Sequence, residues 1–408
     1  MKGIALPIIS TIVDQHAEEA AFLWVLRDQS VHAPHYKPSD QKRLDDRVEA
    51  HLDGLRIAGP DGWSIAWEQF KEHAEPGEAF TVAVLAFEAG DAVRIEDVLT
   101  KAATKPVLGR AVTSALGWVP TAPLASLMSH PLPAVRRIGL AAHAIRRLNP
   151  GTALEKALND TDLFLRSRAL KMAGEMAYAV WLPLLKKHLK IADLPCRFQA
   201  ARAAVLLAGD PAAVAELQAI ALTESGYRQR GAELAIRRLD ANAATNWLKT
   251  LLKMPGSERV ALQAIAALGD PAQMPQVLTL MEQPALARLA GETFTMITGI
   301  ELPANDLEGD RPADFEPGPN EDALDEDVSM DPDDGLPWPD TKRIAGWWTA
   351  HQGKFAKGTR LLLGKPLTVP WLQHVVSNER QRLRAAAAIE LFIQNPKVPL
   401  IETRGRFV

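Results

Sequence analysis

The stretch Arg197–Pro211, RFQAARAAVLLAGDP, decides the fold of this chain of 408 residues. An arginine opens an alanine-rich segment of helical character, and Gly-Asp-Pro closes it. Glycine favours the left-handed conformation that ends a helix, aspartate caps the next helix, and proline suits its first turn. The stretch therefore predicts one helix, a sharp junction and the start of a second helix.

The arginine of this stretch belongs to a ladder of six with nearly constant spacing. The ladder arginines lie 30, 31, 31, 31 and 29 residues apart, at Arg136, Arg166, Arg197, Arg228, Arg259 and Arg288. A small residue stands three positions after five of them, at Gly139, Ala169, Ala200, Gly231 and Gly291, whereas Leu262 follows Arg259. Helix stops recur at Asp91, Asn149, Asp210, Asp240 and Asp270. A neighbouring helix can approach the small residues closely, so each unit is expected to stack on the next.

A helical pair that recurs about every 30 residues buries its apolar face only by stacking on neighbouring pairs. The sequence therefore predicts an all-α fold, a right-handed α-solenoid of short, about 30-residue, helical-pair repeats. Two helices per unit, an arginine at the head of the second helix and a Gly-Asp-Pro junction resemble HEAT-like repeats. This resemblance covers roughly residues 77–300 and implies use as a scaffold.

We expect four regions along the chain. Residues 1–56 are predicted to form an N-terminal helical cap of two helices, over residues 8–27 and 39–57. Residues 57–300 form the repeat array, residues 301–341 an acidic, proline-rich loop or disordered insert, and residues 342–408 a C-terminal helical capping repeat.

The acidic insert dominates the charge distribution. Residues 301–340 contain fifteen carboxylates and one arginine, a formal charge of −14. The whole chain carries −4, so the remaining residues carry +10. We weigh two interpretations: a linker that lies on basic helix ends, or a lid that occupies a basic groove until a partner displaces it. Asp325-Glu326-Asp327 and Asp331-Pro-Asp333-Asp334 lack the full calcium-binding loop.

The ladder arginines, with Asp210, Asp240 and Asp270, are interpreted as structural positions of the repeat. Each arginine is expected to bond carbonyls or a carboxylate of the adjoining unit, although a basic stripe that contacts a partner is the alternative. A second set of arginines follows no strict period and is the predicted partner-binding set: Arg137, Arg168, Arg202, Arg230, Arg237 and Arg238.

Chemistry-bearing motifs are few. His16, His32, His35 and His51 gather near the N-terminus, and we interpret them as polar contacts between two helices rather than as a metal site. Cys196 is the single cysteine, so an internal disulfide is excluded. The sequence contains no glycine-rich phosphate loop, His-Glu-x-x-His or Gly-x-Ser-x-Gly motif, so we predict no catalytic residue, metal or cofactor. The longest apolar stretch is too short to cross a membrane, and a cytoplasmic location is expected.

Both ends of the chain resemble an uncharacterised bacterial family of HEAT-like repeat proteins. The resemblance rests on the strings Leu23-Trp-Val-Leu-Arg-Asp28, His32-Ala-Pro-His35-Tyr36, Arg47–Gly59, Leu336-Pro-Trp-Pro339, Gly346-Trp-Trp348, Gly358–Gly364 and Arg384–Leu391. It implies a Gram-negative bacterium and, for many relatives, genes beside type VI secretion spike and adaptor genes. It implies no catalytic residue.

These observations lead to one expectation and two alternatives. We expect a non-enzymatic scaffold or adaptor that binds a protein partner, such as a secretion spike, adaptor or effector. The first alternative is a nucleic-acid-binding solenoid that uses a basic groove, and the second is a bilin-lyase-like enzyme.

Overall fold

The computed structural model describes residues 8–318 and 330–406 and shows an all-α protein. Within these residues there are twenty α-helices and one antiparallel sheet of two short strands, β1 (Leu361–Leu362) and β2 (Lys365–Pro366). The chain divides into two compact units. Unit 1 holds Met1–His32, Tyr36–Tyr178 and Glu402–Val408, and unit 2 holds Ala33–His35 and Ala179–Ile401.

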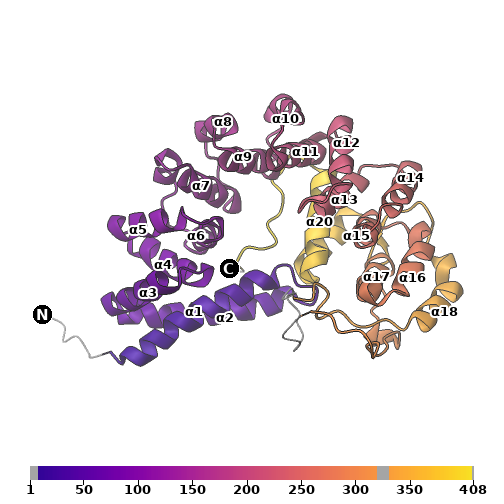
Figure 1. Ribbon diagram of the computed structural model, residues 1–408, viewed down its shortest axis with the longest axis horizontal. Helices are drawn as coiled ribbons and strands as arrows, with labels where there is room; N and C mark the ends of the chain where they lie inside the picture. The colour runs from indigo at the N-terminus through magenta and orange to yellow at the C-terminus, as the bar shows by residue number, and fades with distance from the viewer. Residues whose placement is uncertain (1–7, 319–329, 407–408) are drawn as a thin grey trace, which may run out of the picture. The chain divides into compact units, whose positions relative to one another are not determined.

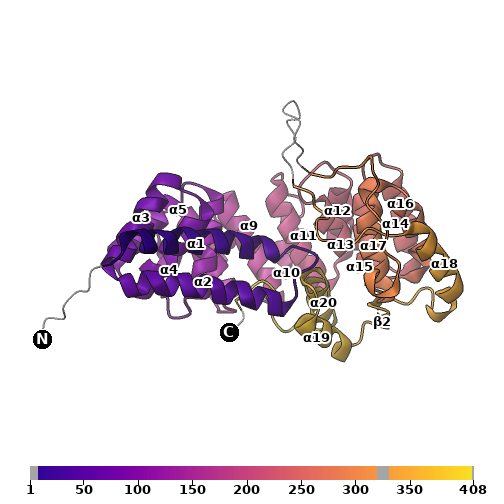
Figure 2. The same cartoon turned by 90° about the horizontal axis from the view of Figure 1, so that it is seen from below.

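Unit 1 begins with two long helices, α1 (Ser10–Ser30) and α2 (Pro38–Ala58), which pack side by side (Figures 1 and 2). Both helices were predicted, and α1 continues three residues beyond its expected end. Trp24 of α1 is 1% exposed, stacks on Phe80 with a centroid distance of 5.0 Å, and donates to Ser114 Oγ at 3.1 Å. These contacts join the N-terminal pair to the helices that follow it.

The rest of unit 1 is a row of shorter helices (Figure 1). They are α3 (Pro60–His73), α4 (Pro76–Ala89), α5 (Ala92–Ala102), α6 (Pro106–Trp118), the 3-10 turn η1 (Ser126–Ser129), α7 (Pro133–Ile145), α8 (Thr152–Leu158) and α9 (Leu163–Glu175). Helix α4 packs on α1 and α6, α6 packs on α7, and α7 packs on α9. One continuous apolar core runs from α1 to α7.

Unit 2 continues the helical pairs. Its elements are η2 (Ala179–Trp181), α10 (Leu182–His188), α11 (Leu194–Ala208), α12 (Pro211–Ala221), α13 (Arg228–Ile236), α14 (Ala241–Leu252), α15 (Glu258–Leu268), η3 (Pro271–Gln273), α16 (Met274–Met281), α17 (Pro284–Thr298), η4 (Pro303–Asn305), α18 (Thr341–His351), η5 (Gln352–Lys354), α19 (Val369–Asn378) and α20 (Gln381–Gln394). Helices α11, α13, α15 and α17 pack in succession. A Cβ built on Gly231 would lie 3.0 Å from the Leu217 carbonyl oxygen, so the small residue permits the predicted close approach.

The Gly-Asp junctions have the predicted chemistry. Gly209 adopts φ +59° and ends α11, and the Asp210 carboxylate accepts from the backbone amides of Ala212 and Ala213. Asp91, Asp240 and Asp270 cap the next helix in the same way. Asn149 is the exception, because Gly151 is the N-cap of α8 and Asn149 only accepts from the Gly151 amide.

The described part of the acidic segment is mostly loop. An isolated bridge joins Glu308 to Pro339. Asp333 is 2% exposed and bonds Arg259 of α15, with Nη1 and Oδ1 2.9 Å apart, while Asp331 bonds Arg288 of α17 at 2.8 Å. Asp333 and Asp331 therefore lie at basic helix starts, a contact that both the linker and the lid interpretation allow. Residues 319–329, which include Asp325-Glu326-Asp327, lie outside the described residues.

The C-terminal region differs from the expected single capping repeat. Helix α18 packs on α16, whereas α20 extends across several pairs of unit 2. Arg382 near its start pairs with Glu292 of α17 at 2.7 Å, and Glu390 near its end pairs with Arg237 at the end of α13. Residues from Glu402 onward belong to unit 1. The prediction of helical structure in 342–408 agrees with α18, α19 and α20, but the sequence did not identify the surfaces on which these helices pack.

None of the helices in residues 8–318 and 330–406 is both long and apolar enough to cross a membrane.

Candidate binding cavity

A cavity of about 310 Å³ lies within unit 1. Its walls come from α1, α6, α7, α9 and the C-terminal residues 402–406. The volume is at the lower end of the range of ligand pockets in proteins. The lining contains apolar side chains such as Ile138 and Ile145, but its charged side chains set its character.

Cations outnumber carboxylates in this lining. The seven cationic residues are Arg27, Arg110, Arg137, Arg168, Lys171, Arg404 and Arg406, and the three acidic residues are Asp28, Glu175 and Glu402. Three stacked helices each contribute cations to one wall: Arg110 on α6, Arg137 on α7, and Arg168 with Lys171 on α9. The cavity is therefore a cationic site built across consecutive helices.

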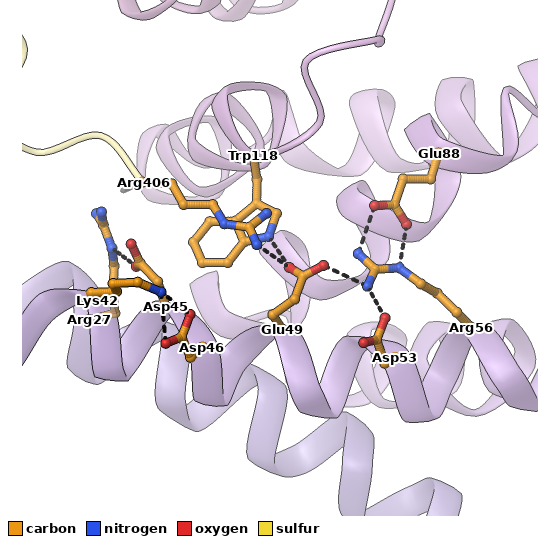
Figure 3. Close-up of polar contacts among 10 residues, drawn as sticks. All are labelled: Arg27, Lys42, Asp45, Asp46, Glu49, Asp53, Arg56, Glu88, Trp118 and Arg406. Atoms are coloured by element: carbon orange, nitrogen blue, oxygen red, sulfur yellow. Dashed lines mark hydrogen bonds and ion pairs between the residues drawn. The ribbon is translucent and has the colours of Figure 1, made fainter. Parts of the chain in front are cut away.

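Arg27 of α1 fixes the C-terminal segment as a wall of the cavity. Its Nε bonds Asp45 Oδ1 at 2.9 Å, and the two side chains are 6% and 1% exposed (Figure 3). Its Nη1 donates to the Arg404 carbonyl at 2.6 Å, and its Nη2 donates to the Gly405 carbonyl at 2.8 Å. One buried guanidinium thus neutralises Asp45 and binds the backbone of a distant chain segment.

Trp118 forms a second attachment for this segment. The Arg406 guanidinium lies 4.5 Å from the centre of the Trp118 ring and pairs with Glu49 at 3.2 Å. Trp118 Nε1 also donates to Glu49, at 2.7 Å. Glu49 in turn bonds Arg56, as Figure 3 shows. Because Arg406 covers the indole, that face of Trp118 is not open to a stacking ligand.

Most other cations of the wall have carboxylate partners. Arg110 Nη1 bonds Asp28 at 2.6 Å, and Arg168 Nη1 bonds Glu175 at 2.9 Å. Lys171 lies 3.5 Å from the same Glu175. One carboxylate therefore serves two cations on α9, which leaves this side of the cavity with an excess of positive charge.

Arg137 differs from the other lining cations. Within the described residues its guanidinium has no hydrogen bond or ion pair and lies 5.6 Å from the centre of the Phe164 ring. Burial lowers the pKa of Arg137, and the more distant Asp162 opposes this effect. Arginine remains charged at neutral pH in proteins. A Cβ built on Gly109 would lie 3.6 Å from Nη2 of Arg137, an ordinary contact distance, so the guanidinium lies beside α6.

Glu402 is a carboxylate in the lining of the cavity. Burial acts to raise the pKa of Glu402, but Arg404 and Arg147 hold it below its ordinary value. Its Oε1 bonds Arg404 Nε at 2.7 Å, and its Oε2 lies 4.0 Å from Arg147. Glu402 is therefore ionised at neutral pH, and its negative charge is accommodated by the surrounding guanidinium groups.

The predicted partner-binding arginines separate into different environments. Arg137 and Arg168 line the cavity. The other four lie in unit 2: Arg202, Arg230, Arg237 and Arg238. The Arg230 guanidinium lies 5.4 Å from the Tyr227 ring centre, Arg237 pairs with Glu390, and Arg238 bonds the Val205 carbonyl. Arg237 and Arg238 thus hold helices of unit 2 together.

The ladder arginines bond backbone carbonyls, but most of these carbonyls lie five to seven residues before the arginine rather than in the adjoining unit, where the structural interpretation expected them. Arg136 donates to the His130 and Pro131 carbonyls, Arg166 to Asp160, Arg197 to Ile191 and Ala192, Arg228 to Ala221 and Gly256, Arg259 to Ala285, and Arg288 to Asp333. Their carboxylate partners are not the junction aspartates Asp210, Asp240 and Asp270, which cap helices instead. The carboxylates are Asp160, Glu216, Glu224, Asp333 and Asp331.

The four histidines do not form one cluster. His16 and His51 meet between α1 and α2, with their Nδ1 atoms 3.2 Å apart. Burial and then the nearby His16 lower the pKa of His51. His32 lines the cavity, and His35 is assigned to unit 2. Among the residues that the structure describes, no group of three or more His, Cys, Asp or Glu residues is arranged to hold a metal ion.

Sequence reasoning missed Arg27, Trp118 and the segment Glu402–Arg406. Arg27 and Trp118 stand near helix ends without any periodic signal, and the terminal segment has no helical pattern. Their roles depend on contacts between residues hundreds of positions apart, as in the bond from Arg27 to Arg404.

Comparisons of this chain with protein-family models, with curated proteins and with solved structures found no match. The geometry of unit 1 is therefore the main support for the function proposed next.

Proposed function

We propose that this chain is a non-enzymatic scaffold or adaptor that binds a protein partner through the cationic cavity of unit 1. The observation that carries the proposal is the set of lining cations Arg110, Arg137 and Arg168, which come from three helices, α6, α7 and α9, that pack in succession. A surface built from successive repeats is the usual binding surface of repeat proteins. The architecture proposed with it is a right-handed α-solenoid of HEAT-like repeats, and the proposed location is the cytoplasm.

The regular features of the chain support the repeat architecture. All six ladder arginines lie within the first five residues of a helix, donate to a backbone carbonyl and are spaced 29 to 31 residues apart. Gly209 and Asp210 end one helix and cap the next, and the same chemistry recurs at Gly269 and Asp270. The glycine and the aspartate fix the turn between the two helices of a unit, and a stacked array requires such a turn in each unit.

The partner class comes from the resemblance of both chain ends to a bacterial HEAT-like family. Many members of that family are encoded beside type VI secretion genes. We therefore propose a secretion spike, adaptor or effector as the partner. A protein adaptor needs a specific surface but no reaction centre, and a cationic wall with interspersed carboxylates satisfies that need.

A nucleic-acid-binding function is the second candidate because the cavity is cationic. One feature favours the protein partner instead. The Trp118 ring is already covered by Arg406, so it offers no free face on that side for stacking on a base.

The experiment is a quantitative affinity purification from the bacterial cells that encode the protein. Tagged wild-type chain is compared with Arg137→Glu in the cavity and with Arg43→Glu, whose side chain is 77% exposed on α2. We expect one or more proteins to be recovered with the wild type and Arg43→Glu and depleted with Arg137→Glu. Identical recovery with all three chains would refute the proposed binding surface, and recovery of no secretion component would refute the secretion partner.

A further inference from the structure

The charges around the cavity do not balance. Five carboxylates serve the seven lining cations: Asp28, Asp45, Glu49, Glu175 and Glu402. Glu175 is shared between Arg168 and Lys171, and Arg137 has no ion pair within the described residues. The excess of positive charge is therefore concentrated on the wall formed by α7 and α9.

A non-helical segment of the chain itself forms part of the cavity wall. Residues 402–406 line the cavity. Two of their backbone carbonyls accept hydrogen bonds from Arg27, whereas Glu402 pairs with Arg404 of the same segment. The cavity therefore already contains an arginine that binds the main chain of a non-helical segment.

Carboxylates on one extended segment can meet cations from more than one helix. Packed helices lie about 8–10 Å apart from axis to axis. An extended chain rises about 3.3 Å per residue, so side chains two or three residues apart on a peptide span a similar distance. Arginine binds carboxylates through two parallel hydrogen bonds, which favours arginine for such recognition.

We propose that the cavity of unit 1 binds an acidic, extended peptide segment of the protein partner, with one of its carboxylates on Arg137. This inference rests on the proposed adaptor function and adds the chemical class of the bound segment. Carboxylates at neighbouring positions of the peptide reach Arg110 on α6 or Lys171 on α9. The bound peptide lies next to residues 402–406, which keep their place as part of the cavity wall.

The test uses the full-length chain and a fluorescein-labelled hexaglutamate peptide, with labelled hexaglutamine as the neutral comparison. We expect saturable binding of hexaglutamate that weakens as salt is added, and no saturable binding of hexaglutamine. Loss of a charged hydrogen bond reduces affinity about 10- to 100-fold, so Arg137→Gln should weaken binding by that factor. Arg137→Glu should weaken it further, and Arg43→Glu should leave it unchanged.

Circular dichroism of each variant establishes that it is folded, and Arg137→Gln serves as the reporter if the charge reversal perturbs the fold. Equal binding of hexaglutamate by wild type and Arg137→Gln would overturn the proposal, as would the absence of saturable binding to the wild type. A DNA duplex that binds more tightly than hexaglutamate and depends on Arg137 would overturn it in favour of nucleic acid. If partner recovery depends on Arg137 but hexaglutamate does not bind, only this inference is refuted. If hexaglutamate binds through Arg137 but no partner is recovered, only the adaptor function is refuted.

Discussion

Replacement of Asp45 by alanine should destabilise unit 1 by about 3–5 kcal/mol, the usual cost of breaking a buried ion pair from one side. Arg27 and Asp45 have side chains that are 6% and 1% exposed, so water cannot replace the lost carboxylate. In the variant, the Arg27 guanidinium keeps its bonds to the Arg404 and Gly405 carbonyls but loses its counter-charge. The destabilisation should therefore reach both α1 and the C-terminal segment.

Hydrogen exchange measured by mass spectrometry on peptides from α1 and α2 reports the opening of unit 1 separately from unit 2. A cost of about 3–5 kcal/mol corresponds to roughly 100- to 4000-fold faster exchange of the most protected amides. Asp46→Ala, at the next position of α2, is the matched control. Its partner is Lys42, and both side chains are more than half exposed, at 62% and 59%, so its loss should cost less than about 1 kcal/mol.

A double-mutant cycle with Arg27→Met and Asp45→Leu measures the interaction free energy between these two side chains. Because the double variant leaves no unpaired charge, its destabilisation should be smaller than the sum of the two single effects by about 2 kcal/mol or more. The reasoning is refuted if the two effects add, or if Asp45→Ala accelerates exchange no more than Asp46→Ala.

Three further predictions follow from individual contacts. Gly77→Ala should lower the thermal stability by about 1–3 kcal/mol, because its Cβ would lie 2.5 Å from the Ala21 carbonyl oxygen; a gain in stability would contradict this. Asp210→Ala should cost about 0.5–2 kcal/mol at neutral pH as a lost helix cap. Burial alone would raise the pKa of Asp210, but Lys186 and backbone amides lower it below its ordinary value of 3.8. The contribution of Asp210 to stability is therefore complete above that value and is lost as the pH falls through the lowered pKa. In urea unfolding, the free energies of unfolding of the wild type and Asp210→Ala should converge in acid. Glu402→Gln should raise the affinity for hexaglutamate several-fold in the same fluorescence titration, because it removes a like charge from the cavity; weaker binding would contradict the electrostatic argument.

The features that were predictable from sequence depend on local chemistry. Gly209 and Asp210 act within a few residues of their own positions, so a Gly-Asp-Pro string predicts the end of one helix and the cap of the next. The arginine spacing likewise predicted a repeated helix start, and the hydrogen bonds of Arg136 to the preceding loop explain it. Each of these interactions forms between residues of the same repeat. A sequence pattern of about 30 residues can therefore predict where the helices start and end.

The candidate site was less predictable because its contacts are distant in sequence. Arg27 bonds carbonyls 377 and 378 residues away, and no local pattern identifies the terminal segment as its partner. Helix α20 was expected to stack at the end of the array, but Glu390 pairs with Arg237, 153 residues earlier. Glu390 and Arg237 bury their charges together, which offsets the desolvation of each. Such pairings depend on the tertiary path of the chain and leave no periodic signal.

Arg136 and Arg137 show how one helix start serves both the fold and the site. Successive residues of an α-helix point about 100° apart, so two neighbouring arginines on α7 cannot face the same surface. Arg136 points to the preceding loop and to Asp160 of the next unit, with an Nη2–Oδ2 distance of 3.1 Å. Arg137 lines the cavity and has no such partner among the described residues. The ladder thus places a structural arginine near each helix start, whereas the residue that follows differs from unit to unit. On α7 that following residue is also an arginine, and its guanidinium lies beside Gly109 of α6 in the lining of the cavity.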